Sequence, residues 1–124
     1  MTTNIMLVGI GGMLGSILRY LASHFIHAAM PSAFPYGTFA VNILGCLLIG
    51  IVFGVSERHE WFSPELRLFL AVGVCGGFTT FSAFAYENVI LLQEKDYLTF
   101  ALYSVLSFVL CLLATLAGLA ITKS

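Results

Sequence analysis

Apolar residues run along this chain in four long segments, and short stretches between them hold most of the polar and charged residues. A helix needs roughly 20 apolar residues to cross the hydrocarbon core of a bilayer. The pattern therefore predicts an all-α membrane protein with four transmembrane helices in a single domain of residues 1–124. The expected spans are about residues 5–26, 37–55, 66–92 and 97–121.

The connections between the spans carry residues that end or begin helices. Pro31 and Pro35 separate the first two spans, because proline lacks a backbone donor and clashes with the preceding turn of a helix. Before the third span, Ser63 is a candidate helix cap, followed by Pro64 at the first helical position and Glu65 in the first turn. These signals support the division into four helices.

The composition agrees with a membrane protein. Hydrophobic residues make up 60% of the chain and charged residues 9%, whereas soluble domains carry about 25% charged residues. A soluble fold of this composition would expose large apolar patches. The net charge of −1 offers no basic patch for nucleic acid. We therefore expect the lipid bilayer, and no nucleic acid, as a partner.

No glycine, cysteine or histidine falls in a recognisable catalytic or zinc-binding motif. Glycines inside the spans, such as Gly11 and Gly50, are typical of close helix packing in lipid. Cys46, Cys75 and Cys111 lie in apolar runs without paired spacing, so we expect them to be small buried hydrophobic residues. The histidines fall in or near different loops, and no nucleophile–base pair is visible. We do not expect an enzyme.

Lysine and arginine are spread almost evenly over the two sides of the predicted bundle. Arg58, Arg67 and Lys123 fall on the side of the termini, while Lys95 and Arg19 fall on the other. An excess of positive charge on one side normally sets orientation. A split of 3 against 2 permits insertion both ways up and an antiparallel pair, but it is equally consistent with one weakly biased orientation.

The third span contains the sequence GGFTTFSAF at residues 76–84, which suits a membrane helix poorly. Adjacent glycines and adjacent β-branched threonines weaken a helix. We therefore predict a break near mid-membrane. Irregular backbone at that depth is tolerated only when it is buried in protein or lines a polar cavity, and its freed carbonyls can coordinate a cation. The alternative is a kinked helix whose threonine hydroxyls satisfy the backbone.

Phe81 and Phe84 follow the predicted break and share one helical face. Thr79, Thr80 and Ser82 are interleaved with them. A phenyl ring has a positive edge, so ring edges turned inward are able to stabilise a small anion without a formal charge. Packing is the ordinary role of such a pair, and the neighbouring hydroxyls favour the anion-binding role here.

The fourth span carries a polar stripe formed by Tyr103, Ser107, Cys111 and Thr115, which recur at every fourth position. Such a stripe is typical of a water-facing or ion-facing track. Hydrogen bonding between helices explains it equally well, because serine and threonine suit that role in membranes.

Three further polar residues lie inside the predicted spans. Asn42 must find a hydrogen-bonding partner there, and its amide donors suit either an anion or a neighbouring helix. Arg19 and Glu87 are the ionisable side chains clearly within spans, which makes them candidates for a functional site. Each fits a vestibule or a structural pair.

Taken together, these features resemble the Fluc (CrcB) fluoride channel family over essentially the whole chain. The most specific feature is the sequence at residues 76–84 with Glu87, and the pairs Gly11-Gly12 and Val41-Asn42 agree with it. The resemblance implies an antiparallel, dual-topology homodimer in the inner (plasma) membrane, with two fluoride pathways. The implied function is passive export of fluoride from the cytoplasm, which reduces its toxicity.

The resemblance also implies roles for individual residues. The implied fluoride pore residues are Asn42, Thr80, Phe81, Ser82, Phe84, Glu87, Tyr103, Ser107 and Thr115. Arg19 matches a vestibule arginine. A structural sodium ion, bound and not transported, is expected on the backbone carbonyls of Gly76 and Thr79. The chain departs from the family pattern at Ala83, Ala85 and Cys111, where hydroxyl residues are usual.

Two other functions, a multidrug exporter and an assembly subunit, share some of these features. A dual-topology, proton-coupled small multidrug exporter also has four short spans, but it needs a membrane-embedded carboxylate in the first span. This chain offers Arg19 there instead. A noncatalytic assembly subunit explains the glycine packing but not a polar helix break beside a polar stripe. Fluoride selectivity would rest on pore size and donor placement, as in other filters.

Overall fold

The computed structural model describes residues 1–123, and within that range the chain is helical without strands. The elements are α1 (Thr2–Ala29), α2 (Tyr36–Arg58), α3 (Pro64–Arg67), η1 (Leu68–Cys75), α4 (Gly76–Phe78), α5 (Phe81–Gln93) and α6 (Tyr97–Ile121). The stretch from α3 to α5 acts as one span, so four helical stretches are long and apolar enough to cross a membrane. The prediction of four transmembrane helices is confirmed.

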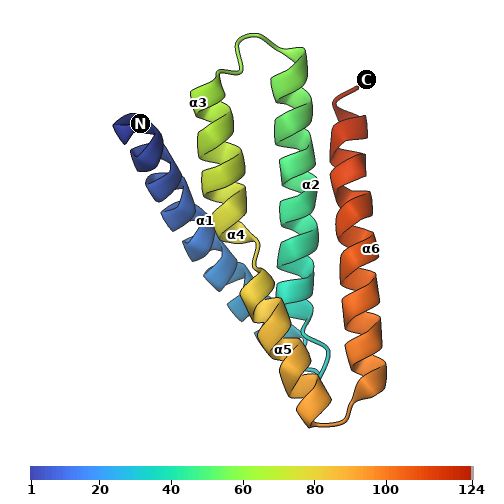
Figure 1. The fold of residues 1–124 in the computed structure, drawn as a ribbon. Helices are drawn as coiled ribbons and strands as arrows, with labels where there is room; N and C mark the ends of the chain where they lie inside the picture. The colour runs from blue at the N-terminus through green and yellow to red at the C-terminus, as the bar shows by residue number, and fades with distance from the viewer. Residues whose placement is uncertain (124) are drawn as a thin grey trace.

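The helices form an up-and-down arrangement with both termini at one end (Figure 1). The connection between α2 and α3 lies at that same end, and the α1–α2 and α5–α6 connections lie at the other. Helix α2 runs along α6, while α1 packs mainly on η1 and α4. The third span therefore packs on α1 before its break, and after the break α5 contacts α6 and α2.

Glycines let these helix pairs approach backbone to backbone. A Cβ atom added to Gly11 of α1 would lie 2.7 Å from the carbonyl oxygen of Phe69 and 2.9 Å from the Cα of Gly73. On the other pair, Gly118 of α6 faces Gly50 of α2, where an added Cβ would lie 3.0 Å from the Gly50 carbonyl carbon. Lipid supplies no hydrophobic driving force between helices, so their association relies on the close van der Waals packing that small residues permit.

The predicted break in the third span is present at Thr79 and Thr80. Their backbone angles are φ −85°, ψ 156° and φ −150°, ψ 123°, both extended, and helix resumes at Phe81. The segment before the break was not predicted, because η1 is π-helical over eight residues. At its end the N–H of Gly76 donates to the carbonyl of Ala71, five residues back. Such wide turns are rare and often accompany functional sites.

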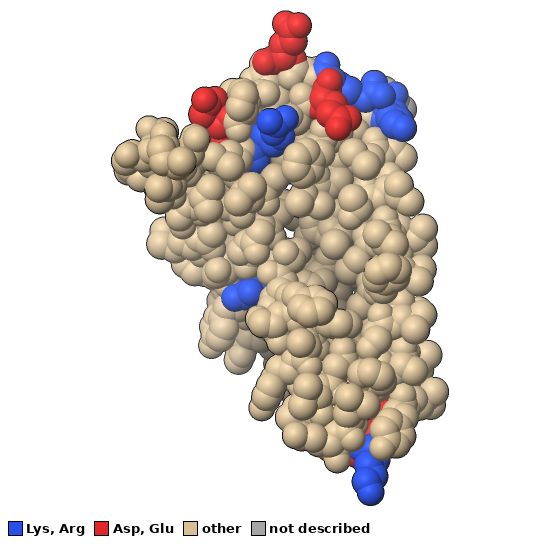
Figure 2. All heavy atoms as spheres, viewed as in Figure 1, with Lys and Arg blue, Asp and Glu red and all other residues tan. Residues whose placement is uncertain are grey.

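Charge is concentrated at the two ends of the molecule (Figure 2). A broad and largely uncharged belt separates them, as a bilayer requires. Large apolar side chains lie exposed on this belt, among them Phe25 of α1 at 65% and Phe108 of α6 at 68% exposure. These side chains suit contact with lipid or with a second chain.

Candidate functional site

The centre of the candidate site is a pair of hydrogen bonds between Asn42 of α2 and the peptide groups of Thr80. The N–H of Thr80 donates to Asn42 Oδ1 at 2.8 Å, and Asn42 Nδ2 donates to the carbonyl oxygen of Thr80 at 3.0 Å. The side-chain amide thus accepts the Thr80 N–H in place of the Gly76 carbonyl, which would be its partner in a continuous helix. Asn42 holds two helices together and, because an amide carries two N–H groups, it keeps one N–H for another acceptor.

The hydroxyls at the break also bond locally. Thr79 Oγ1 donates to the carbonyl of Cys75 at 3.0 Å. Thr80 Oγ1 accepts from the N–H of Ala83 at 3.2 Å, which caps the first turn of α5, and it shares a further hydrogen bond with Ser82 Oγ at 3.2 Å. The threonines therefore stabilise the break, as the kinked-helix alternative expected, but the helix is interrupted and not merely bent.

These bonds leave two backbone carbonyls without their helical donors. In an α-helix the carbonyl of Gly76 would accept from Thr80, and that of Thr79 from Ala83. Here the N–H of Thr80 donates to Asn42 and that of Ala83 donates to Thr80 Oγ1. These two carbonyls are among those that the break releases, and they belong to the residues predicted to hold a cation.

A cavity of about 360 Å³ opens beside the break, and we call it the break cavity. Its lining comes from α2, η1, α4, α5, α6 and the break itself, and includes no charged side chain. The predicted site residues on it are Asn42, Gly76, Thr79, Thr80, Phe81, Phe84 and Ser107. The fold thus brings together residues that are spread along the sequence from α2 to α6.

Ser107 of α6 presents an unused hydroxyl to this cavity. Its side chain is only 7% exposed, and its Oγ is the one buried side-chain nitrogen or oxygen in residues 1–123 that lacks a hydrogen-bonding partner. A buried polar group without a partner costs about 1–3 kcal/mol. The hydroxyl is therefore available to form a hydrogen bond with a polar or ionic ligand in the cavity.

Two phenyl rings stand at the same cavity. Phe81 is 77% exposed, while Phe84 packs its ring on that of Tyr103, with the centroids 4.9 Å apart. The rings of Phe81 and Phe84 are tilted by 43° with centroids 5.6 Å apart. Phe84 is fixed by packing, and Phe81 projects from the surface of a single chain.

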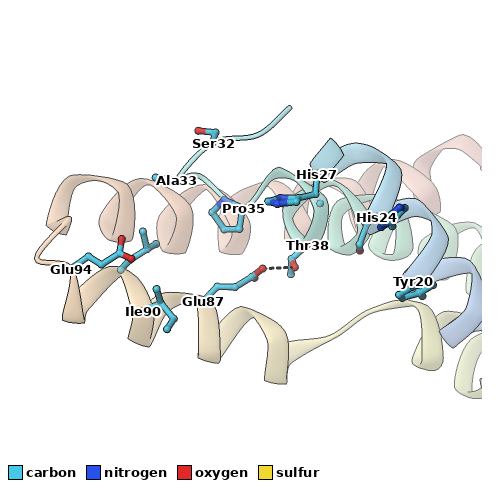
Figure 3. Close-up of a pocket in the computed structure, with 13 residues that line it drawn as sticks. Tyr20, His24, His27, Ser32, Ala33, Pro35, Thr38, Glu87, Ile90 and Glu94 are labelled. Carbon is cyan, nitrogen blue, oxygen red and sulfur yellow. Dashed lines mark hydrogen bonds between the residues drawn. The ribbon is translucent and has the colours of Figure 1, made fainter. Parts of the chain in front are cut away.

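The carboxylate of Glu87, on α5, lies between α2 and α6. Thr38 Oγ1 donates to Glu87 Oε2 at 3.0 Å, and the hydroxyl of the fully buried Tyr103 donates to Oε1 at 2.9 Å. A cavity of about 490 Å³ lies beside the carboxylate and also reaches His24 and His27, and we call it the Glu87 cavity (Figure 3).

Thr38 belongs to this site through its bond to Glu87, although it is not among the predicted pore residues. A threonine near a helix start is unremarkable, but Thr38 lies one helical turn before Asn42 on the same helix face. That spacing was the signal that would have found it.

Arg19 lines a third cavity of about 440 Å³ together with Thr38, Thr80 and Ser82. This Arg19 cavity shares Thr80 with the break cavity and Thr38 with the Glu87 cavity. The three cavities therefore follow one another around the break. Arg19 and Glu87 do not form a hydrogen-bonded pair; the Glu87 carboxylate accepts from neutral hydroxyls instead.

Tyr103 and Thr115 are the predicted pore residues that line none of the three cavities. Tyr103 still contacts the site through Glu87 and Phe84, whereas Thr115 lies apart. Its hydroxyl reaches the carbonyls of Cys46 at 3.2 Å and Cys111 at 3.1 Å, and Thr115 does not line any of the three cavities. The fourth-span stripe thus divides. Ser107 and Cys111 face the break cavity, whereas Thr115 joins α6 to α2.

Comparison with known proteins identifies a family for this arrangement. The family model described as CrcB-like protein, Camphor Resistance (CrcB), matches residues 6–119. The chain is 51% identical to the fluoride-specific ion channel FluC of Flavobacterium psychrophilum, over 94% of each chain. It is 42% identical to the protein of the same name from Azobacteroides pseudotrichonymphae, over 99% of this chain and 98% of that one. The chain belongs to the CrcB family of membrane proteins.

Proposed function

We propose that this protein is a fluoride-selective channel of the inner (plasma) membrane that passively exports fluoride from the cytoplasm. Its relatives bear the name fluoride-specific ion channel over nearly the full length of the chain. The chain is a multi-pass membrane protein with four spans and is a transporter and not an enzyme.

The observation that carries the proposal is the unpaired hydroxyl of Ser107 in an uncharged cavity with phenyl rings. Fluoride is small and strongly hydrated, so a pore has to replace its water ligands with hydrogen-bond donors. Ser107, the free N–H of Asn42 and the ring edges of Phe81 and Phe84 supply such donors. Neutral donors replace water without holding the anion as tightly as a fixed cation would, which permits conduction.

We further propose that the working unit is an antiparallel homodimer with two pathways. Phe81 is 77% exposed on one chain and needs a facing surface to enclose an anion. The exposed apolar side chains of the belt and the nearly even charge of the two ends suit pairing of chains inserted in opposite directions. A cysteine introduced at Lys95 would then label from each face of sealed vesicles in about half of the chains. Labelling from one face alone would refute dual topology.

The break also fits a structural sodium ion. Sodium is a hard cation that prefers oxygen ligands, and the carbonyls of Gly76 and Thr79 have lost their helical donors. Two such carbonyls from each chain would meet at a twofold axis, and Gly76 is exposed on the single chain. We propose that a sodium bound there ties the two breaks together and is not transported.

The multidrug exporter gains no support, because α1 contains no aspartate or glutamate that exchanges protons. To test the channel function, the protein is reconstituted in liposomes loaded with potassium fluoride, and fluoride release is followed with an ion-selective electrode after addition of valinomycin. Matched liposomes loaded with chloride are the control. Rapid fluoride release with chloride retained supports the proposal, and well-formed protein that releases neither ion refutes it.

A further inference from the structure

The three cysteines, which are far apart in the sequence, converge on the break cavity. Cys46 comes from α2, Cys75 from the end of η1 and Cys111 from α6, and all three line this one cavity. All three are free thiols. Their sequence spacing suggested only packing, because it is unlike that of disulfide or zinc motifs.

Cys46 and Cys111 lie on neighbouring helices, α2 and α6, which pack along each other. The hydroxyl of Thr115 lies 3.2 Å from the Cys46 carbonyl and 3.1 Å from the Cys111 carbonyl, so the two residues oppose each other across the α2–α6 interface. Cys75 lines the same cavity from the third span.

The cavity suits a cation that needs only two ligands. Within residues 1–123, no three histidine, cysteine or acidic side chains are grouped closely enough to hold a metal ion. Zinc, which takes four ligands, therefore does not fit. Monovalent soft cations bind two thiolates in a line, and soft thiolate ligands select copper(I) and its congener silver(I).

We propose that Cys46 and Cys111 form a two-thiol site for a soft monovalent cation, copper(I) or silver(I), and that occupancy of this site closes the break cavity to fluoride. Binding replaces two S–H bonds by two metal–sulfur bonds and releases two protons to water. No electron is transferred. One monovalent cation and two thiolates leave a net charge of −1 in the cavity.

The closure rests on the proposed function, since it assumes that fluoride passes the break cavity. Ser107 and Asn42 line the same cavity as the two thiols. A bound cation therefore occupies space beside the fluoride donors, and the net negative charge of its thiolate complex repels an anion. Both effects act in the same direction.

Silver(I) is the probe for the test, and it is added as silver nitrate to fluoride-loaded liposomes. The buffer contains no chloride, because silver chloride precipitates, whereas silver fluoride is soluble. Fluoride efflux is compared with and without silver for the wild type, Cys46→Ser, Cys111→Ser and Cys75→Ser, each against its own silver-free rate. Silver retained by each detergent-purified variant after dialysis is measured separately by elemental mass spectrometry. The silver-binding measurement does not depend on channel activity.

We expect the wild type and Cys75→Ser to retain about one silver ion per chain. When silver is present, their fluoride efflux should fall to the leak rate of protein-free vesicles. Cys46→Ser and Cys111→Ser should retain no silver and keep their silver-free efflux. The site is refuted if the wild type retains no silver, or if Cys75→Ser loses silver while Cys111→Ser keeps it. Silver retention without fluoride efflux in untreated vesicles would leave the site standing and refute the channel.

Discussion

Asn42 and Thr80 pair through two hydrogen bonds of 2.8 and 3.0 Å, in which a side-chain amide takes the place of a backbone partner. This pairing holds α2 against the break in the third span. It also diverts the N–H of Thr80 from the carbonyl of Gly76. A single amide therefore fixes the break and frees the Gly76 carbonyl, to which we assign the proposed sodium.

Replacing Asn42 by aspartate should lower both stability and fluoride flux. Asn42→Asp keeps an acceptor for the Thr80 N–H but removes the donor to its carbonyl, which costs about 1–3 kcal/mol for a buried group. The new negative charge also repels fluoride. Thermal unfolding in detergent and liposome efflux measure the two effects.

Asn88→Asp is the matched control for that change. Asn88 is buried on α5, and its Oδ1 accepts from Ser104 Oγ at 3.3 Å, an interaction that aspartate retains. Equal losses of flux in both variants would show that burying a carboxylate, and not breaking the Asn42–Thr80 pair, is responsible.

Ser107→Ala should separate conduction from stability. Its hydroxyl has no partner in the fold, so its removal costs no internal hydrogen bond and should leave the melting temperature unchanged or higher. Fluoride efflux should fall about tenfold, equivalent to about 1.4 kcal/mol of lost anion stabilisation. Thr115→Val provides the contrast, because it removes hydrogen bonds to two carbonyls and should lower stability more than flux. The reverse pattern would assign the anion track to Thr115.

The two phenylalanines should also differ in their effects. Phe81→Ile should abolish most fluoride flux with little loss of stability, because the ring is 77% exposed on the single chain. Phe84→Ile should reduce flux and also destabilise the fold, since an aromatic pair such as Phe84–Tyr103 adds about 0.5–1.5 kcal/mol. Efflux and thermal unfolding are measured for both variants. Full flux in both would remove the ring-edge argument.

Tyr103→Phe and Glu87→Gln should be non-additive in a double-mutant cycle. The Tyr103 hydroxyl donates to Glu87 at 2.9 Å inside the bundle. Hydrogen bonds between helices in membranes contribute about 0.6 kcal/mol on average and at most about 1.7. A coupling energy in that range, measured from unfolding of the four proteins, is the expected result. Purely additive changes would mean that the hydroxyl and carboxylate do not interact.

Gly118→Ala should disrupt the contact between α6 and α2. An added Cβ would approach the carbonyl of Leu47 and lie 2.8 Å from the Ile51 nitrogen, and backbone atoms cannot yield cheaply. Gly9→Ala is the control, because nothing lies within 4 Å of its added Cβ. We expect loss of folded protein on size-exclusion chromatography for Gly118→Ala alone, and equal behaviour of the two variants would contradict this packing.

The sequence predicted much of this architecture because its signals are local. Long apolar runs gave the four spans, and the glycines and threonines of residues 76–84 gave the break. The site residues other than Thr115 gather around that break, Tyr103 through its contacts with Glu87 and Phe84. Local patterns do not reveal which atoms meet across helices, however. The alternatives for Asn42 thus stayed open until its bonds with Thr80 were seen.

Two features depend on tertiary packing and had no readable signal. The π-helical turns of η1 lie where its backbone meets α1 at Gly11 and Gly73, and an apolar sequence such as LFLAVGVC does not distinguish them from α-helix. Thr115 shares the periodicity of Ser107, yet its hydroxyl reaches the Cys46 carbonyl of α2 as well as the Cys111 carbonyl of its own helix. Equal spacing in the sequence did not mean equal surroundings.

The most direct test of the central claim is the reversal potential of the current through the reconstituted protein in a planar bilayer. Fluoride and chloride gradients are set in opposite directions across the membrane. A fluoride-selective channel gives a current that reverses at the equilibrium potential of fluoride. Reversal at the chloride potential, or at that of the cation, would contradict the account.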